Sequence, residues 1–224
     1  MALALDVKGD AVIRGDLSVT TMTVPAAAVV NASVAAGAAI ERSKLAENAL
    51  AEFPINMLDF GVHDALATRL PGTSATDDLG LYGGTYGTNA PLIRTYDVKA
   101  AGAVTLYARA LVPLPECYQD GEDVQIRCAG GMVTTVAGTT ATVDVEAWRV
   151  DKDGTLGAAD LCADAAQSIN SLTFANKDFD ITPTTLVAGD FLDVRITIAV
   201  NDAASGTAVI AALANIALRC DIKG

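Results

Sequence analysis

The sequence contains a single histidine, His63, and this limits the catalytic chemistry open to the chain. A Ser/His/Asp or Cys/His triad would have to use this residue. It lies in a Gly-Val-His-Asp context beside Asp64, which matches no such motif. A histidine-rich metal site is excluded by the count alone. We therefore expect His63 to lie in a loop or at an interface.

Two groups of acidic residues are candidates for binding a cation. Asp151-Lys152-Asp153-Gly154-Thr155 partly matches a calcium loop, but it lacks the further acidic residue before the glycine and the closing glutamate of the EF-hand pattern. Asp-Gly is typical of hairpin turns, so we expect a turn here. The second group is Glu116, Asp120, Glu122 and Asp123, around Pro113, Pro115 and Gly121. We expect a solvated turn there as well, and we predict no metal ion and no cofactor.

A glycine-rich segment runs from Gly80 to Gly87 inside a long, irregular connection between Leu70 and Leu92. It lacks the Gly-Lys-Ser/Thr ending and the strand-to-helix setting of a phosphate-binding loop. Long loops of this kind are usually functional surfaces. We therefore expect Tyr82 and Tyr86 to act in a contact loop.

The four cysteines, Cys117, Cys128, Cys162 and Cys220, are widely spaced and form no Cys-x-x-Cys pair. An even number permits disulfides. The first residues, Met1 to Asp6, lack the basic start of a signal peptide, so we expect synthesis in a reducing cytoplasm and buried free thiols. No constellation in the sequence indicates catalysis, and we predict no catalytic residues and no enzyme activity.

Size and charge set further limits. A chain of 22.9 kDa should bury roughly 70% of its unfolded surface, which allows a sizeable core. Hydrophobic residues make up 51% and charged residues 19%, while the net charge is −12. A strongly acidic chain is a poor partner for nucleic acid or an anionic bilayer. The uncharged stretch from Leu17 to Ile40 is rich in alanine and interrupted by polar residues, so we expect no membrane span.

Residues 1–55 are predicted to form an extended N-terminal arm. Gly-Asp recurs at Gly9-Asp10 and Gly15-Asp16 between alternating apolar and polar residues, which indicates short β-repeats. Residues 34–45 have the spacing of a short helix. Such short elements cannot bury a core of their own, so we expect their apolar residues to contact partner chains. These predicted interface residues are Val12, Ile13, Leu17, Val19, Val29, Val30, Val34, Ile40, Leu45 and Leu50.

Residues 56–224 are predicted to form an all-β domain, because short alternating segments recur there with turn residues between them. The expected strands are 92–98, 103–112, 123–136, 142–150, 171–174, 179–181, 192–200 and 208–222. About eight strands at this spacing favour a β-sandwich, and a jelly roll in particular. Trp148 lies mid-strand, so we expect it in the core.

The last two expected strands are predicted to form a pair in the core, joined by a hairpin loop at 201–206. One buried face should comprise Leu192, Val194, Ile196, Ile198 and Val200. The other should comprise Ile210, Ala212, Ala214, Ile216 and Leu218.

Several short motifs resemble those of tailed-bacteriophage structural proteins. Gly15-Asp16-Leu17-Ser18-Val19-Thr20 is similar to the β-repeats that introduce trimeric phage fibres, and residues 34–45 resemble a phrase common in phage structural proteins. From about Leu58 onward, the chain resembles the jelly-roll head decoration (cement) proteins. The motifs that carry this resemblance are Leu70-Pro71-Gly72 with Asp77-Asp78-Leu79, Gly154-Thr155-Leu156-Gly157, Gly189-Asp190-Phe191-Leu192 and Asp221-Ile222-Lys223-Gly224.

The resemblance implies a structural function without chemistry. Such proteins bind the outer surface of the capsid as trimers and clamp neighbouring subunits of the major capsid protein. The expected location is therefore the exterior of a virion that is assembled in the host cytoplasm. The alternative is a trimeric receptor-binding fibre or spike, with the arm as its attachment end and the jelly roll binding a host glycan. That alternative predicts exposed aromatic residues for sugar stacking.

Overall fold

The computed structural model describes residues 50–203 and 206–223. The chain divides into two units, Met1–Glu41 and Arg42–Gly224, and every described residue belongs to the second. The expected β-repeats, the helix over 34–45 and all the predicted arm contacts except Leu50 lie outside the described residues.

The described residues form strands connected by turns, with one short 3-10 helix, η3 (Met57–Asp59). The strands are β1 (Ala51–Pro54), β2 (Gly61–Val62), β3 (Ala65–Arg69), β4 (Gly80–Tyr82), β5 (Leu92–Arg94), β6 (Gly102–Pro113), β7 (Val124–Met132), β8 (Thr140–Val150), β9 (Leu156–Asp160), β10 (Gln167–Ser168), β11 (Ala175–Ile181), β12 (Phe191–Asp202) and β13 (Ala211–Cys220).

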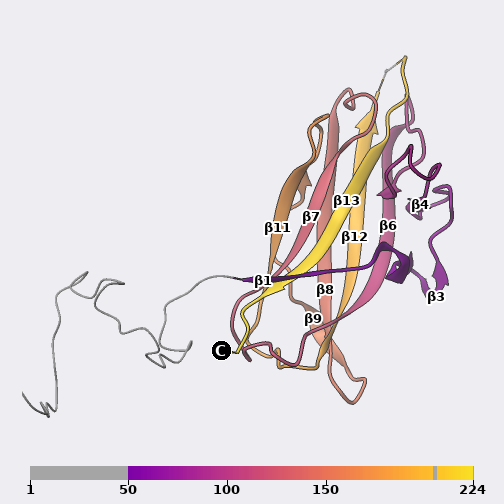
Figure 1. Ribbon diagram of the computed structural model, residues 1–224. Helices are drawn as coiled ribbons and strands as arrows, with labels where there is room; N and C mark the ends of the chain where they lie inside the picture. Colours follow the sequence, from indigo (N-terminus) through magenta and orange to yellow (C-terminus); the bar gives the residue numbers. More distant parts are fainter. Residues whose placement is uncertain (1–49, 204–205, 224) are drawn as a thin grey trace, which may run out of the picture. The chain divides into compact units, whose positions relative to one another are not determined.

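These strands build two antiparallel sheets that face each other (Figure 1). Sheet A has the order β11-β7-β13-β5-β4, with β1 also paired to β13. Sheet B has the order β10-β8-β12-β6-β2-β3, with β9 also paired to β8. From β5 to β8 and again from β10 to β13, each strand lies in the sheet opposite to the one before it. Four-stranded sets β5-β13-β7-β11 and β6-β12-β8-β10 connected in this way are a jelly roll, which confirms the predicted fold.

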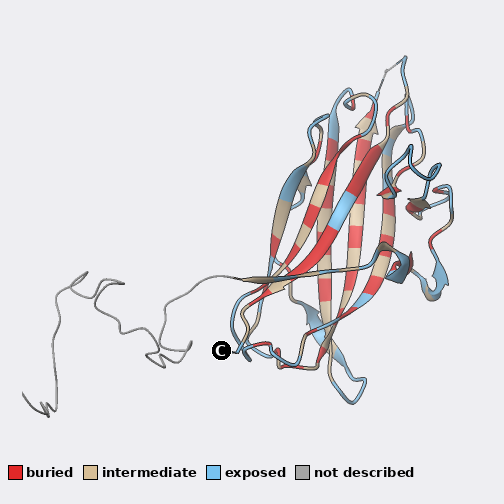
Figure 2. Cartoon of the chain, viewed as in Figure 1, coloured by how far each residue is buried: buried red, intermediate tan, exposed pale blue. Residues whose placement is uncertain are grey.

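The core lies between the two sheets, and alternation along the strands supplies it. On β12 the predicted inward face is confirmed, because Leu192, Val194, Ile196, Ile198 and Val200 are all buried. Buried and part-exposed positions alternate along the long strands in Figure 2. The buried core runs from Phe60 to Cys220 in the sequence, and both sheets contribute to it.

The predicted inward face of β13 is wrong over half of its length. The pairing of β13 with β7 shifts register between Leu213 and Asn215, which marks a β-bulge. Before the bulge Leu213 faces the core; after it Ile216 and Leu218 do, whereas Ala214 is exposed. The extra residue therefore reverses which positions point inward.

The predicted hairpin between β12 and β13 is also wrong, because the two strands lie in different sheets. β12 pairs with β6 and β8, and β13 pairs with β7, β5 and β1. The end of β12 is fixed by the buried Asp202, whose carboxylate accepts hydrogen bonds from the Ala100 and Gly138 amides at 2.8 Å each. The chain thus passes from one sheet to the other.

Several short segments differ from the sequence prediction. Residues 171–174 are not a strand, and the short β10 precedes them. Residues 80–82, which we predicted to be irregular, form β4 beside β5. Residues 51–54, which we assigned to the arm, form β1 and pair with residues 217–220 of β13. This segment is part of sheet A.

Candidate binding groove on sheet B

The outer face of sheet B carries an ordered set of large and charged side chains. Strand register sets them in rows across β6, β12 and β8. Arg109, Arg195 and Glu146 form one row. Leu111, Asp193 and Trp148 form the next row. All these positions alternate with buried ones, so their side chains point away from the core.

A groove of about 340 Å³ crosses this face. Arg109, Arg195, Asp193, Glu146 and Trp148 line it from the three central strands. His63, from the turn between β2 and β3, lines it on the β6 side, and Leu156 of β9 lines it on the β8 side. The turn between β2 and β3 on one side and strand β9 on the other thus flank a floor made of β6, β12 and β8.

The charges in the groove are paired. Arg109 donates two hydrogen bonds to Asp193, one of them from Nε at 2.6 Å, and this bonding raises the pKa of Arg109. Arg195 pairs with Glu146, which lies directly opposite on β8. The two arginines are themselves direct cross-strand neighbours, so each needs its carboxylate to offset the repulsion between them. The groove is therefore polar but nearly neutral.

Trp148 lies in this groove, so its predicted burial in the core is wrong. The sequence contains a signal for the observed position. Trp148 has the same parity as Asp144 and Glu146, and alternate residues of a strand point to the same side. Two carboxylates on that side indicate the solvent face.

His63 lies in the turn between β2 and β3, as the sequence predicted. Its ring packs against Tyr107, with centroids 4.6 Å apart. Its two nitrogens lie 3.6 Å from a carboxylate oxygen of Asp77 and 3.5 Å from one of Asp78. Within residues 50–203 and 206–223, these three side chains are the one His/Cys/Asp/Glu group spaced closely enough for a cation, and the same distances suit an ion pair.

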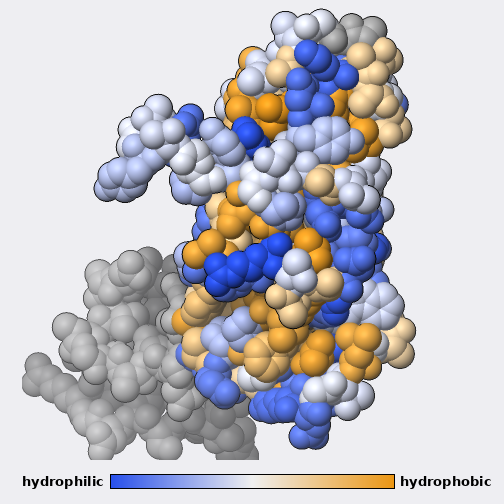
Figure 3. All heavy atoms as spheres, turned by 90° about the vertical axis from the view of Figure 1, so that its right-hand side faces the viewer, coloured by the Kyte–Doolittle hydropathy of each residue, from blue (hydrophilic) through white to orange (hydrophobic). Residues whose placement is uncertain are grey.

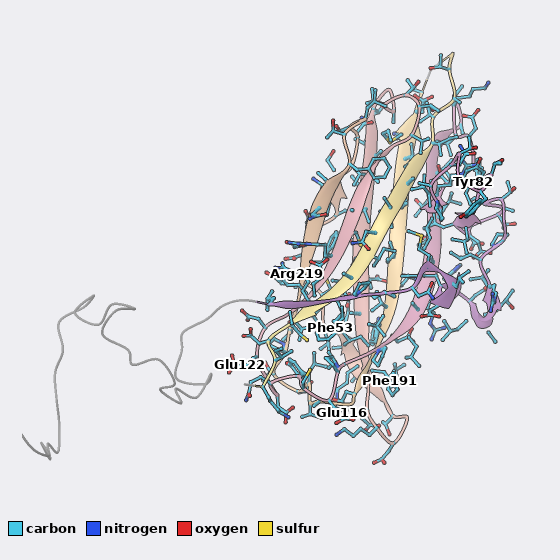
Figure 4. All side chains as sticks on the ribbon, in the orientation of Figure 1. Phe53, Tyr82, Glu116, Glu122, Phe191 and Arg219 are labelled. Carbon is cyan, nitrogen blue, oxygen red and sulfur yellow. The ribbon has the colours of Figure 1, made fainter. Side chains whose placement is uncertain are left out.

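The predicted contact tyrosines lie outside the groove. Tyr82 belongs to β4, where the Arg94 guanidinium stacks 3.6 Å from its ring centre, and Figure 4 shows it beside that strand. Tyr86 is fully exposed in the loop that follows. Figure 3 faces the edge of the sandwich that carries β3 and β4, where hydrophobic and hydrophilic residues are interspersed. Leu50 is half-buried directly before β1.

The two acidic groups that we considered as cation sites lie in turns, as predicted. Asp151 Oδ1 accepts hydrogen bonds from the Asp153 and Thr155 amides at 3.0 and 2.7 Å, which closes the predicted hairpin between β8 and β9. In the second group, the Ala188 amide donates to Asp120 and lowers the pKa of that carboxyl. Glu116 and Glu122 lie at the same end of the sandwich as this turn (Figure 4).

The cysteines are free among the described residues. Cys128, Cys162 and Cys220 are buried as predicted, and burial raises the pKa of their thiols to about 12, 11 and 12. Cys117 is exposed, so the prediction of burial is wrong there. Thiols with such high pKa values are poor nucleophiles at neutral pH.

Sequence reasoning did not identify a second charged cluster, on the outer face of sheet A. Arg127 donates to both oxygens of Asp178 at 2.6 and 2.7 Å, and Arg219 lies 3.4 Å from the same carboxylate. Glu52 of β1 lies 3.2 Å from Arg127 and 3.8 Å from Arg219. The cluster links β1, β13, β7 and β11, which are far apart in sequence.

No protein-family model and no curated protein sequence matches this chain. Solved structures with a similar fold include the xylan-binding module CBM15, with a TM-score of 0.40 and 14% identity over 78% of this chain and 99% of that chain. The CBM22-1 xylan-binding domain from Paenibacillus barcinonensis Xyn10C has a TM-score of 0.32 and 13% identity, over 78% of this chain and 99% of that chain. A chain in the structure of infectious bursal disease virus Gx strain has a TM-score of 0.36 and 13% identity, over 79% of this chain but only 33% of that chain. At these identities the likeness concerns the fold alone. In residues 50–203 and 206–223, no helix is long and apolar enough to span a bilayer.

Proposed function

We propose that this chain is a structural virion protein that binds the exterior of a phage capsid as a homotrimer and clamps neighbouring subunits of the major capsid protein. The observation that carries the proposal is the core that runs from Phe60 to Cys220, which both sheets supply. A sandwich with its own core can fold without the N-terminal arm. The arm and its apolar residues are then available to another surface, in keeping with the resemblance to decoration proteins.

The attachment of β1 to sheet A supports a load-bearing arm. β1 pairs with β13 over four residues, and Glu52 adds ion pairs to Arg127 and Arg219. The arm is therefore joined to the sandwich through a paired strand with ion pairs, and these interactions would resist a force applied to the arm. Apolar arm segments that lie in a groove or pair with strand edges would provide the contact with the capsid.

The test removes residues 1–49 and keeps β1. Full-length protein and the truncated protein are each mixed with particles of the encoding virus that lack the protein, and binding is measured by co-sedimentation. We expect full-length protein to bind and the truncated protein, confirmed as folded by circular dichroism, to remain in the supernatant. Full binding by the truncated protein would overturn the proposal, and Tyr86→Ser would then test the loop over residues 71–87 as the binding surface.

A receptor-binding fibre or spike is the second candidate function. The observation that favours it is the position of Trp148 on the outer face of sheet B, because this alternative predicts aromatic residues open to solvent. Quantitative mass spectrometry of purified particles separates the two functions. A copy number comparable to that of the major capsid protein supports decoration, and a few copies per particle support a fibre.

A further inference from the structure

We propose that the groove on sheet B binds a neutral oligosaccharide through side chains of β6, β8 and β12. This inference rests on the groove itself and holds whether or not the arm attaches the protein to a capsid. The groove, at about 340 Å³, lies at the lower end of the roughly 300–1,000 Å³ range of small-molecule sites. It therefore suits a short stretch of a chain ligand rather than a large epitope.

The central strand of the groove floor, β12, offers side chains and no free strand edge. β12 is paired along its length with β6 on one side and with β8 on the other. β6 also pairs with β2 at Arg109, and β8 also pairs with β9 and β10 at two positions each. An extended peptide would need an unpaired strand edge to add to the sheet. A ligand in this groove must instead be recognised by its own polar groups and faces.

The polar groups in the groove match hydroxyl groups, which both donate and accept hydrogen bonds. The carboxylates of Asp193 and Glu146 supply acceptors, and each is paired with a guanidinium group, that of Arg109 or Arg195. Arg195 Nε is buried and has no hydrogen-bond partner among the described residues. Because this nitrogen is closed to solvent, a ligand hydroxyl would reach it only after the Arg195 side chain moved.

The charge balance selects a neutral ligand. Each arginine is already paired with a carboxylate, so an anionic sugar or a phosphate would bring a further negative charge next to Asp193 or Glu146. The whole chain carries a net charge of −12, which adds to the repulsion of anions.

Trp148 supplies the apolar part of the site. Its ring lies in the row of Asp193, and Leu156 lines the same side of the groove. One face of a pyranose ring presents C–H groups, which pack against an aromatic ring while the hydroxyls point outward to polar partners. An aromatic surface bounded by carboxylate and guanidinium groups provides both kinds of contact.

Full-length protein is first applied to an array of neutral hexose and pentose oligosaccharides, with sialylated and sulfated oligosaccharides as the anionic arm. The best neutral binder is then titrated while tryptophan emission is recorded. Trp148 is the only tryptophan of the chain, so the signal reports on the groove directly. We expect saturable binding with a change in emission intensity or wavelength.

Two variants locate the site, with affinities measured by isothermal titration calorimetry. Trp148→Ala should weaken binding roughly tenfold or more, as loss of an aromatic contact of about 1.5 kcal/mol implies. Leu111→Ala, on the other side of Asp193 in the same row and outside the groove, should leave the affinity unchanged. Circular dichroism checks that both variants fold.

Several outcomes would overturn the inference: no neutral oligosaccharide bound, preference for the anionic arm, or equal affinity of Trp148→Ala and the parent protein. The Trp148→Ala variant is also mixed with particles that lack the protein. Retained particle binding is the expected result, whereas its loss would mean that this face contacts the capsid instead of a sugar. Sugar binding therefore tests the groove, and particle binding of the protein without residues 1–49 tests the arm, so each proposal can fail without the other.

Discussion

Asp178 holds the charged cluster on sheet A together, and its protonation should weaken the fold. Hydrogen bonds from Arg127 lower the pKa of Asp178 below the ordinary value of 3.8. A carboxyl group whose pKa is lower in the folded state stabilises the fold above its unfolded pKa, and this stability is lost as the pH falls through the folded pKa. We therefore expect the melting temperature to fall as the pH drops below about 4, and part of that fall to be absent in Asp178→Asn.

Melting temperatures of both proteins from pH 7 to pH 2.5 check this prediction. Asp59→Asn is the control, because it makes the same change in net charge at an exposed position. Equal acid sensitivity of the parent and Asp178→Asn would show that this carboxylate contributes nothing to the acid dependence.

At the level of residues, sequence reasoning identified turns better than it identified the site. The Asp151–Gly154 hairpin followed from local chemistry, since Asp-Gly suits the turn and Gly154 has a φ of 82°. The groove brings together His63, Arg109, Trp148 and Asp193, which no local pattern connects. Parity along β8 could have assigned Trp148 to the outer face, but the partners on β6 and β12 depend on which strands are neighbours.

At the level of elements, the bulge in β13 determines which of its residues face the core, and substitutions on either side of it can test this. Leu213 is fully buried and Ala214 is exposed, the reverse of simple alternation from Ile210. Leu213→Ala should destabilise the protein by about 2–5 kcal/mol, as loss of a buried leucine side chain usually does. Ala214→Ser, next to it, should change the stability by less than about 0.5 kcal/mol. Chemical denaturation of both variants measures these free energies of unfolding, and a larger effect at Ala214 would mean that the bulge lies elsewhere.

The long strands were predictable because each alternates over many residues. β6, β8 and β12 match the predicted ranges to within a few residues. The bulge was not predictable, because Ala211-Ala212-Leu213 and Ile216-Ala217-Leu218 are apolar at consecutive positions and allow either face to point inward. Short strands such as β1, β4 and β10 carry too few residues for a periodic signal. β1 is stabilised by the distant β13, whereas β4 pairs with β5, the next strand in the sequence.

At the level of the whole molecule, the jelly roll followed from the number and spacing of strands, but the connection between its sheets did not. Neighbouring strands in a sequence often form hairpins, and this favoured a direct pair of β12 and β13. In the jelly roll each of these strands instead pairs with partners from much earlier in the chain. Only long-range packing decides between the two arrangements.

The oligomeric state tests the link between the arm and the whole particle. Ordering the arm costs about 1–2 kcal/mol of backbone entropy per residue, so its apolar residues need an extensive contact to hold it. Three arms that pack together would cover part of one another's apolar surface before any capsid is present, and the remaining apolar residues would stay available to the capsid. We therefore expect sedimentation velocity at micromolar concentration to give a mass three times 22.9 kDa for the full chain. Without residues 1–49, the protein should sediment as a monomer. A monomeric full chain would contradict the trimer, and a truncated protein that stays trimeric would move the contact between subunits to the sandwich.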